Sequence, residues 1–255
     1  MRICRLVAIP AVVLLLAAFA PAPALAVDGG AAPGVGKKEP KEPPGPPPQL
    51  ILFHGGSFLF EDPFFEPSTD QRAIAAGFVP HYVQYPLNNM PAAVLVARAE
   101  ARRLRHKFGA DRVYAYGASA GGTLAAELSG DGLVAAAVAK APVSDLVGWE
   151  WPLGAYGTNY YEQVSLNEAA RYRLSPDRRP QKSPLLIYQG RADRVVPAAM
   201  NELFAAKYPR VYLWLVPGGH TTERARPYLI SKAMHWLART AARQARAAAH
   251  VEALP

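Results

Sequence analysis

The chain has 255 residues, of which 51% are hydrophobic and 19% charged, and its formal net charge is +8. A chain of this length and apolar content predicts one globular domain with a sizeable core. Its single cysteine, Cys4, lies near the N-terminus, which excludes a cysteine nucleophile, a cysteine metal site and a disulfide framework in the rest of the chain. No zinc-finger spacing, basic heptad or aromatic-basic signature is present, so we expect no nucleic-acid partner.

The first 26 residues have the pattern of a secretory signal peptide. Arg2 and Arg5 precede an apolar run from Leu6 to Ala20, and Ala24-Leu25-Ala26 is a small-x-small cleavage sequence. The run is interrupted by Pro10 and is short for a membrane span, although an uncleaved anchor is the alternative. We expect cleavage near Ala26, a secreted or extracytoplasmic protein without a stable membrane span, and a net charge that falls from +8 to +6 because two arginines leave.

Residues 27–48 are predicted to be a linker because they are rich in proline and glycine. Within them, Lys37 to Pro44 has no apolar side chain to bury. Such a composition favours an extended chain, and its purpose is open. The folded domain is expected over residues 49–255.

Short apolar runs then alternate with longer amphipathic runs. The expected strands are 50–53, 78–85, 112–116, 133–139, 184–188 and 211–216. The expected helices are 70–76, 91–108, 120–128, 167–174, 198–207 and 226–250. This alternation predicts an α/β fold with a mostly parallel sheet of about six strands and helices on both faces.

The third expected strand leads into Gly117-x-Ser119-x-Gly121 and then into a helix. This is the spacing of a nucleophile elbow, in which a serine occupies a tight turn between strand and helix and small residues avoid collisions. The free N–H groups and the dipole of the helix N-terminus would favour negative charge there. We predict that Ser119 is a nucleophile.

Other chemically suitable residues follow the ends of other strands, where functional groups gather in a parallel sheet. Asp193 follows the fifth expected strand and His220 the sixth. In this order, His220 would take the proton of Ser119 and Asp193 would orient the imidazole. Asp145 also follows a strand and is the main rival for the acid.

The first strand runs into His54-Gly55-Gly56, where glycines leave backbone N–H groups free to face a ligand. We expect the N–H groups of Gly55, Gly56 and Ala120 to form an oxyanion hole. For His54 we favour a structural role in the loop over a catalytic one.

These motifs together resemble a carboxylesterase of the α/β-hydrolase superfamily, most closely the hormone-sensitive-lipase-like and related His-Gly-Gly esterases. The resemblance spans Gln49 to about Leu237. Ser57 stands where that group usually has a third glycine, and no acidic residue precedes Ser119. The antiparallel strands that usually open the fold are expected to be missing, because only the linker precedes the first strand. The segments that carry the resemblance are His54 to Phe58, Tyr85-Pro86-Leu87, Pro91-Ala92-Ala93, Gly117 to Gly122, Gly190 to Pro197 and Gly219-His220.

An aromatic stretch between the fourth and fifth strands is a candidate substrate pocket, or else a packed cap that binds nothing. The candidate pocket residues are Ser57, Phe58, Trp149, Trp151 and Tyr156, with Tyr160 and Tyr161 as further aromatic neighbours.

We predict a secreted serine hydrolase that cleaves small carboxylic esters of short acyl chains or small alcohols through an acyl-enzyme, with no cofactor and no metal. An amidase or peptidase, or an envelope acyltransferase, would use the same residues. A non-catalytic envelope adaptor with this fold is the alternative from another class. Envelope association is compatible with the basic helix-like segments, and the oligomeric state is open.

Overall fold

The structure is a computed structural model that describes residues 45–63, 66–150, 152 and 159–252. The chain divides into two units, Met1–Lys41 and Glu42–Pro255. The predicted signal peptide and the predicted linker up to residue 44 lie outside the described residues, so the fold concerns the second unit alone.

The second unit is built on one parallel sheet of six strands in the order β2-β1-β3-β4-β5-β6. The predicted sheet of about six strands is therefore confirmed, and in the described part of the chain β1 has no antiparallel strand before it. β1, β3, β4 and β5 are buried along their whole length, as expected for parallel strands covered on both faces. The strands are β1 (Gln49–Phe53), β2 (Val79–Tyr82), β3 (Val113–Ala118), β4 (Ala136–Lys140), β5 (Leu185–Gly190) and β6 (Val211–Val216).

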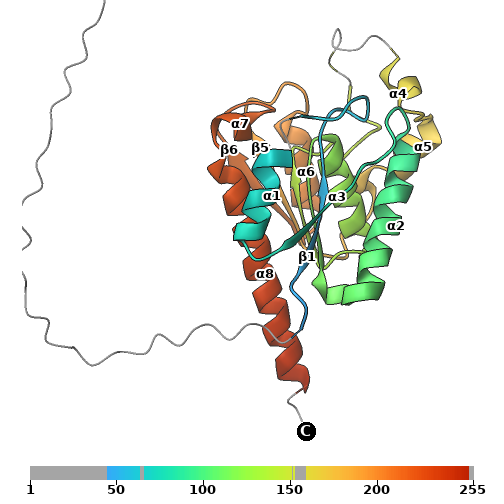
Figure 1. The fold of residues 1–255 in the computed structure, drawn as a ribbon. Helices are drawn as coiled ribbons and strands as arrows, with labels where there is room; N and C mark the ends of the chain where they lie inside the picture. The colour runs from blue at the N-terminus through green and yellow to red at the C-terminus, as the bar shows by residue number, and fades with distance from the viewer. Residues whose placement is uncertain (1–44, 64–65, 151, 153–158, 253–255) are drawn as a thin grey trace, which may run out of the picture. The chain divides into compact units, whose positions relative to one another are not determined.

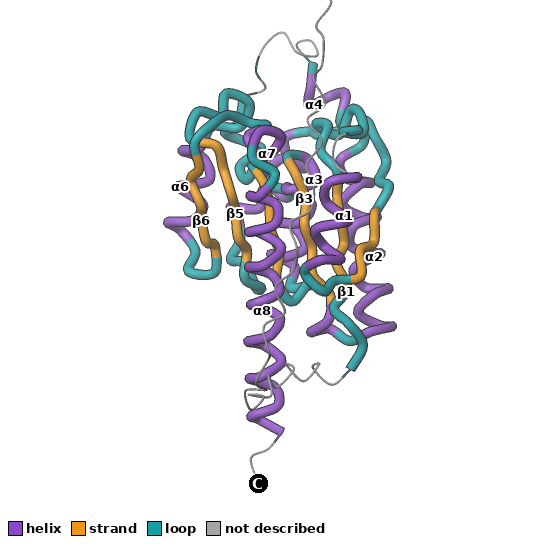
Figure 2. The backbone as a smooth tube through the Cα atoms, turned by 60° about the vertical axis from the view of Figure 1, so that its left-hand side comes forward, coloured by secondary structure: helices purple, strands orange, loops and turns teal. Residues whose placement is uncertain are grey.

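Helices cover both faces of the sheet, as Figures 1 and 2 show. The short 3-10 helices η1 (Ala110–Arg112) and η2 (Pro176–Arg178) lie in the connections. The α-helices are α1 (Glu66–Ala75), α2 (Met90–Phe108), α3 (Ala120–Asp131), α4 (Tyr160–Gln163), α5 (Glu168–Arg173), α6 (Ala198–Lys207), α7 (Thr222–Ala225) and α8 (Tyr228–Glu252).

The sheet separates two buried apolar clusters. On one face, α1 and α8 pack against alternate side chains of the strands, among them Leu52 and Tyr116. On the other face, α2, α3 and α6 pack against the intervening side chains, such as Ile51 and Phe53. This alternation follows from the two-residue period of a strand.

Several predicted elements differ in extent from the observed ones: the helix expected from residue 70 begins at Glu66 in α1, and the strand expected from residue 133 begins at Ala136 in β4. The strand expected over 78–85 pairs only over β2, because the chain leaves the sheet after Val83 donates its N–H to Leu52. No helix in the described part of the chain has both the length and the apolar character needed to cross a membrane.

The strands are parallel, so their carboxyl ends meet at one edge of the sheet. The loops at that edge contain the residues that the sequence singled out (upper part of Figure 1).

Candidate active site

Ser119 occupies a strained turn between β3 and α3. Its backbone has φ 54° and ψ −113°, in a region that L-residues rarely adopt. The turn leaves no room for a side chain at Gly121, since a Cβ atom there would lie 2.2 Å from the carbonyl oxygen of Phe53. Ser119 donates its N–H to the carbonyl oxygen of Lys140 at 2.8 Å, which ties the turn to the end of β4. This is the local geometry that the glycine spacing predicts.

The three predicted triad side chains form a continuous hydrogen-bonded path. Ser119 Oγ lies 3.0 Å from His220 Nε2, and His220 Nδ1 lies 2.8 Å from Asp193 Oδ2. Asp193 is buried, whereas His220 is partly accessible. Since Asp193 faces Nδ1, the arrangement favours the tautomer in which Nε2 is free to accept a proton from Ser119.

The carboxylate of Asp193 is held in its charged form. Burial by itself raises the pKa of this carboxyl, but the hydrogen bond and charge of His220 act in the opposite direction. The N–H groups of Val195 and Val196 add hydrogen bonds of 2.9 and 3.0 Å to Oδ1. The pKa of Asp193 therefore lies below its usual value.

Two buried side-chain amides, those of Gln189 and Asn201, restrain the Asp193 carboxylate through hydrogen bonds. Gln189 Nε2 donates to Asp193 Oδ2 at 3.0 Å and to the carbonyl oxygen of Val196 at 2.7 Å. Asn201 Nδ2 in turn donates to Gln189 Oε1 at 2.7 Å and to the carbonyl oxygen of Pro142 at 3.0 Å. Neither amide was predicted as part of the site, although a glutamine inside an otherwise apolar strand is a detectable signal.

The loop that contains His220 is attached to the sheet at two points. A Cβ atom on Gly190, at the end of β5, would lie 2.3 Å from the carbonyl oxygen of Gly219, so this close approach requires glycine. Lys140 Nζ and Glu223 Oε1 form an ion pair of 3.0 Å in which both side chains are largely buried. Glu223 belongs to α7, directly after the histidine, so the ion pair restrains His220 relative to β4.

The His54-Gly55-Gly56 loop passes directly beside Ser119. A Cβ atom on Gly55 would lie 3.6 Å from the Cβ of Ser119. His54 Nδ1 and Tyr85 Oη lie 2.5 and 3.5 Å from the carbonyl oxygen of Gly55. Because a carbonyl and the following N–H point in opposite directions across a trans peptide, the N–H of Gly56 faces away from His54.

His54 itself is fully buried and stacks on Tyr85, with ring centroids 4.2 Å apart. Burial lowers its pKa and keeps the ring neutral. Its contacts are those of a loop-stabilising residue, which is the role that the sequence favoured.

The next two residues of this loop are also strained. Ser57 and Phe58 have φ of 59° and 61°, which is unusual for residues other than glycine. The carbonyl oxygen of Gly56 accepts the N–H groups of Leu59 and Phe60 at 2.9 and 3.0 Å, so the turn is closed by its own backbone.

The N–H groups of Gly55, Gly56 and Ala120 have no hydrogen-bond acceptor among the described residues. Ala120 is the first residue of α3, where N–H groups lack helical partners. These donors are suited to an oxyanion.

A narrow pocket opens beside Ser119 and Ala120. Of the predicted pocket residues, the structure places Ser57, Phe58 and Trp149 in its wall. Trp151 and Tyr156 lie outside the described residues. The other lining residues were not among the candidate pocket residues, because their positions depend on the tertiary fold. They are Val143, Leu146, Tyr160, Val195 and Val196.

Asp145, the rival acid, does not face the histidine. Its Oδ1 accepts hydrogen bonds from Arg178 at 3.2 Å and from the N–H of Val147 at 3.0 Å. Of these two acids, Asp193 therefore contacts His220.

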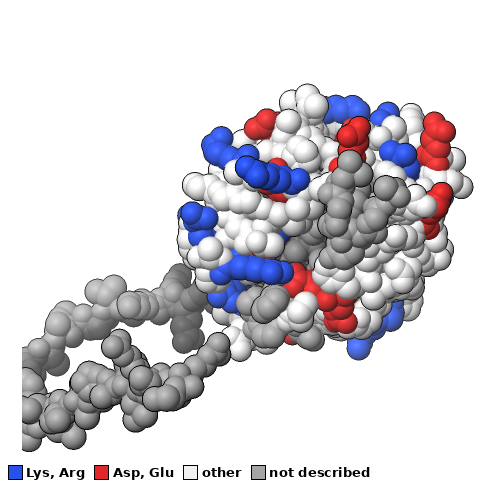
Figure 3. Space-filling model, turned by 90° about the horizontal axis from the view of Figure 1, so that it is seen from above, with Lys and Arg blue, Asp and Glu red and all other residues white. Residues whose placement is uncertain are grey.

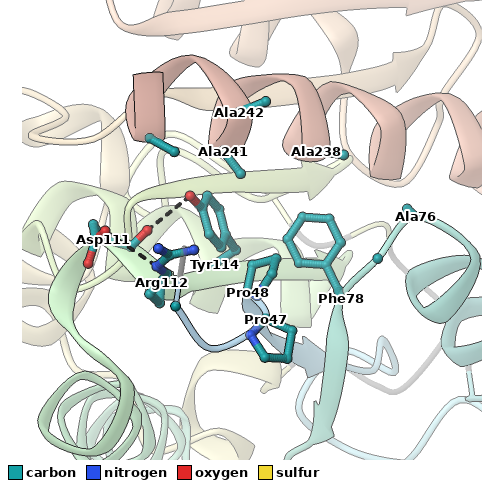
Figure 4. Close-up of a pocket in the computed structure, with 13 residues that line it drawn as sticks. Pro47, Pro48, Ala76, Phe78, Asp111, Arg112, Tyr114, Ala238, Ala241 and Ala242 are labelled. Atoms are coloured by element: carbon teal, nitrogen blue, oxygen red, sulfur yellow. Dashed lines mark hydrogen bonds and ion pairs between the residues drawn. The ribbon is translucent and has the colours of Figure 1, made fainter. Parts of the chain in front are cut away.

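A larger cavity, of about 390 Å³, lies at the opposite edge of the sheet. Figure 4 shows Pro48, Phe78 and Tyr114 facing the alanines of α8 across it. Tyr114 and Ser119 are five residues apart on one strand and its turn, which places the cavity on the order of 15 Å from the serine. Its lining contains no serine and no histidine.

The face seen from above in Figure 3 includes the carboxyl edge of the sheet, and it shows acidic and basic side chains interspersed. Arg224, on α7, forms an ion pair with Asp62 at 3.1 Å. Among the described residues, no group of three or more His, Cys, Asp or Glu side chains is placed to hold a metal ion.

Comparison with known families identifies the class. The model of the prolyl oligopeptidase family, peptidase family S9, matches residues 92–250, which is more than half of the chain. The chain therefore belongs to the prolyl oligopeptidase family. The predicted resemblance to the α/β-hydrolase superfamily is confirmed.

Several solved structures share the fold. Esterase 2 of Thermogutta terrifontis, phosphoramylated by tabun, is 20% identical, with a TM-score of 0.64 over 78% of this chain and 85% of that chain. The same esterase with butyrate bound is also 20% identical, with a TM-score of 0.61 over the same shares, 78% and 85%.

An acetyl ester-xyloside bifunctional hydrolase from Caldicellulosiruptor lactoaceticus is 19% identical, with a TM-score of 0.60 over 74% of this chain and 80% of that chain. At these identities the likeness concerns the fold alone. A search of curated proteins found no match.

Proposed function

We propose that this protein is a serine hydrolase that cleaves carboxylic esters of short acyl chains. The observation that supports this best is the unbroken path from Ser119 Oγ through His220 to the buried Asp193, at 3.0 and 2.8 Å. A serine in this setting is activated because a neutral imidazole accepts its proton as the Oγ attacks.

The proposed reaction has two halves. Ser119 Oγ attacks the ester carbonyl carbon, and its proton passes to His220 Nε2. The N–H groups of Ala120, Gly55 and Gly56 stabilise the negative oxygen. His220 then protonates the alcohol oxygen as the ester C–O bond breaks, which leaves an acyl-Ser119. A water molecule, deprotonated by His220, attacks this acyl group and releases the carboxylic acid with the serine restored.

The solved structures with a similar fold support a small ester as substrate. One of these proteins is described as an acetyl ester-xyloside bifunctional hydrolase, and another is an esterase with butyrate bound. The pocket beside Ser119 is narrow and apolar, which suits a short acyl group.

The test is hydrolysis of p-nitrophenyl esters from acetate to palmitate by the full-length protein and by Ser119→Ala. We expect turnover of short chains that falls by at least about 10⁴-fold in the variant. Reaction of paraoxon with Ser119, read by mass spectrometry, reports the activated serine independently of turnover. Preferential turnover of long-chain triglycerides would contradict the short-chain proposal.

Peptide hydrolysis is the second candidate, because the chain belongs to a family named for an oligopeptidase. Faster turnover of peptide p-nitroanilides than of any ester would favour it. Product analysis with an added acceptor alcohol would reveal acyl transfer. A folded protein whose Ser119 fails to react with paraoxon would favour a non-catalytic adaptor.

We also propose that the protein is exported, on the strength of the signal pattern in residues 1–26. Sequencing the N-terminus of the exported protein should give Val27. Protein that keeps residues 1–26 and stays in the cytoplasm would contradict export.

A further inference from the structure

Aromatic rings line the pocket that contains the Ser119 side chain. Ser119 and Ala120 line it together with Phe58, Trp149 and Tyr160. The free volume is only about 10 Å³, roughly what the centre of one water molecule requires. A methyl group is similar in size to one water molecule, so the pocket has room for about one such group.

This pocket lies on the acyl side of the site. In the proposed reaction the leaving alcohol must face His220 Nε2, because that atom protonates it. His220 does not line the pocket, whereas Ser119, Ala120 and the neighbouring Ser57 do. With the oxyanion beside Ala120 and the alcohol toward the histidine, the acyl chain is the substituent left to enter this pocket.

The ring of Tyr160 is held rigidly. It is 3% exposed, and its hydroxyl donates to the carbonyl oxygen of Ser57 at 3.1 Å. It packs edge-to-face against Trp149, with centroids 5.5 Å apart and an interplanar angle of 89°. Trp149 Nε1 donates to the carbonyl oxygen of Val195 at 2.9 Å. Tyr160 is thus hydrogen-bonded to the loop that contains Gly55 and Gly56, and Trp149 to the loop that contains Asp193.

A longer acyl chain therefore has a specific obstacle. Each added methylene must displace the Tyr160 ring, which breaks its hydrogen bond to Ser57 or its packing on Trp149. Closely packed interiors resist such insertions.

We propose that Tyr160 ends the acyl pocket and restricts the enzyme to acetyl esters. This inference rests on the proposed function and names its substrate class. Acetyl transfer to Ser119 forms the Oγ–carbonyl carbon bond, breaks the bond to the alcohol and returns one proton to that alcohol through His220. Water then releases acetate.

The test compares kcat/KM for p-nitrophenyl acetate, butyrate and hexanoate. For the wild type we expect acetate to exceed butyrate by about tenfold or more. Tyr160→Ala should lower this ratio at least about tenfold, because it removes the ring from the pocket. Tyr160→Phe keeps the ring in the pocket and loses the hydrogen bond to Ser57, so it should lower this ratio by less than Tyr160→Ala does.

Two further variants make the result decisive. Leu146→Ala widens the same pocket from a different wall and should also favour butyrate, which provides a test if Tyr160→Ala does not fold. Tyr172→Ala removes a tyrosine that is 59% exposed on α5, and it should leave the ratio unchanged.

An acetate-to-butyrate ratio that stays the same in folded Tyr160→Ala or Leu146→Ala would overturn the proposal, as would a wild type that prefers butyrate. If Ser119 still reacts with paraoxon in these cases, only the acyl limit fails. If no ester is turned over and Ser119 does not react, the proposed function fails as well.

Discussion

Replacing Asp193 by asparagine keeps the size of the side chain and changes what it offers to His220. Oδ1 accepts the N–H groups of Val195 and Val196 at 2.9 and 3.0 Å. An asparagine must keep its carbonyl oxygen on these two donors, because its NH2 group would find no acceptor there. The NH2 group then faces His220 Nδ1. That nitrogen becomes an acceptor, the ring proton moves to Nε2, and the histidine can no longer accept the proton of Ser119.

The magnitude follows from the tautomer. In a serine peptidase triad, the same change lowers kcat by about 10⁴-fold, which corresponds to about 5.5 kcal/mol of activation free energy. In this protein the new NH2 group also meets Gln189 Nε2, a donor that lies 3.0 Å from Asp193 Oδ2. The buried clash of two donors should lower the free energy of unfolding by about 1–3 kcal/mol.

The assay is kcat on p-nitrophenyl acetate, with thermal unfolding followed by circular dichroism. The matched control is Asp145→Asn, since Asp145 pairs with Arg178 at 3.2 Å and does not contact His220. We expect the control to keep kcat within about threefold of the wild type. A folded Asp193→Asn variant that retains more than a tenth of the wild-type kcat would contradict this prediction, as would an Asp145→Asn variant that loses as much activity as Asp193→Asn.

Two further predictions concern stability. Gly121→Ala places a Cβ atom 2.2 Å from the carbonyl oxygen of Phe53 and should lower the free energy of unfolding by about 3 kcal/mol or more. In Gly77→Ala the new atom has no neighbour within 4 Å, so only the strain of φ +88° should remain, about 1–2 kcal/mol; equal losses in urea titrations would contradict the steric argument. Burial raises the pKa of Glu127 to about 7, so the folded protein keeps a proton that the unfolded chain releases near pH 4.5. As the pH rises from 4.5 to 7, the free energy of unfolding of the wild type should therefore fall by about 3 kcal/mol relative to that of Glu127→Gln. Unfolding free energies of the two proteins that change with pH in parallel would contradict this.

The secondary structure and the sheet were predictable because their signals are local. The runs at β1, β3, β4 and β5 are continuously apolar, as strands covered on both faces must be. Helical runs between them require parallel crossovers. The glycines at 117 and 121 around Ser119 indicate a turn that has no room for a larger side chain at either position.

The polar interior was not predictable in the same way. Gln189 and Asn201 contact each other at 2.7 Å through a fold that brings β5 and α6 together. Lys140 and Glu223 are 83 positions apart, yet their side chains form an ion pair of 3.0 Å. Each of these residue types is usually exposed, and the contacts between them join elements that are far apart in the chain.

Local sequence patterns were enough to predict the succession of strands, the turn at Ser119 and the order Ser119, Asp193, His220. These features depend on backbone preferences and on spacing within a few residues. Two features depend on the tertiary fold: Asp193 rather than Asp145 contacts the histidine, and Tyr160 lines the pocket. Both aspartates follow strands, and only the path of the loops brings one of them within 2.8 Å of His220. The ring of Tyr160 reaches Ser57 across 103 residues of chain, a contact that depends on how the whole sheet is assembled.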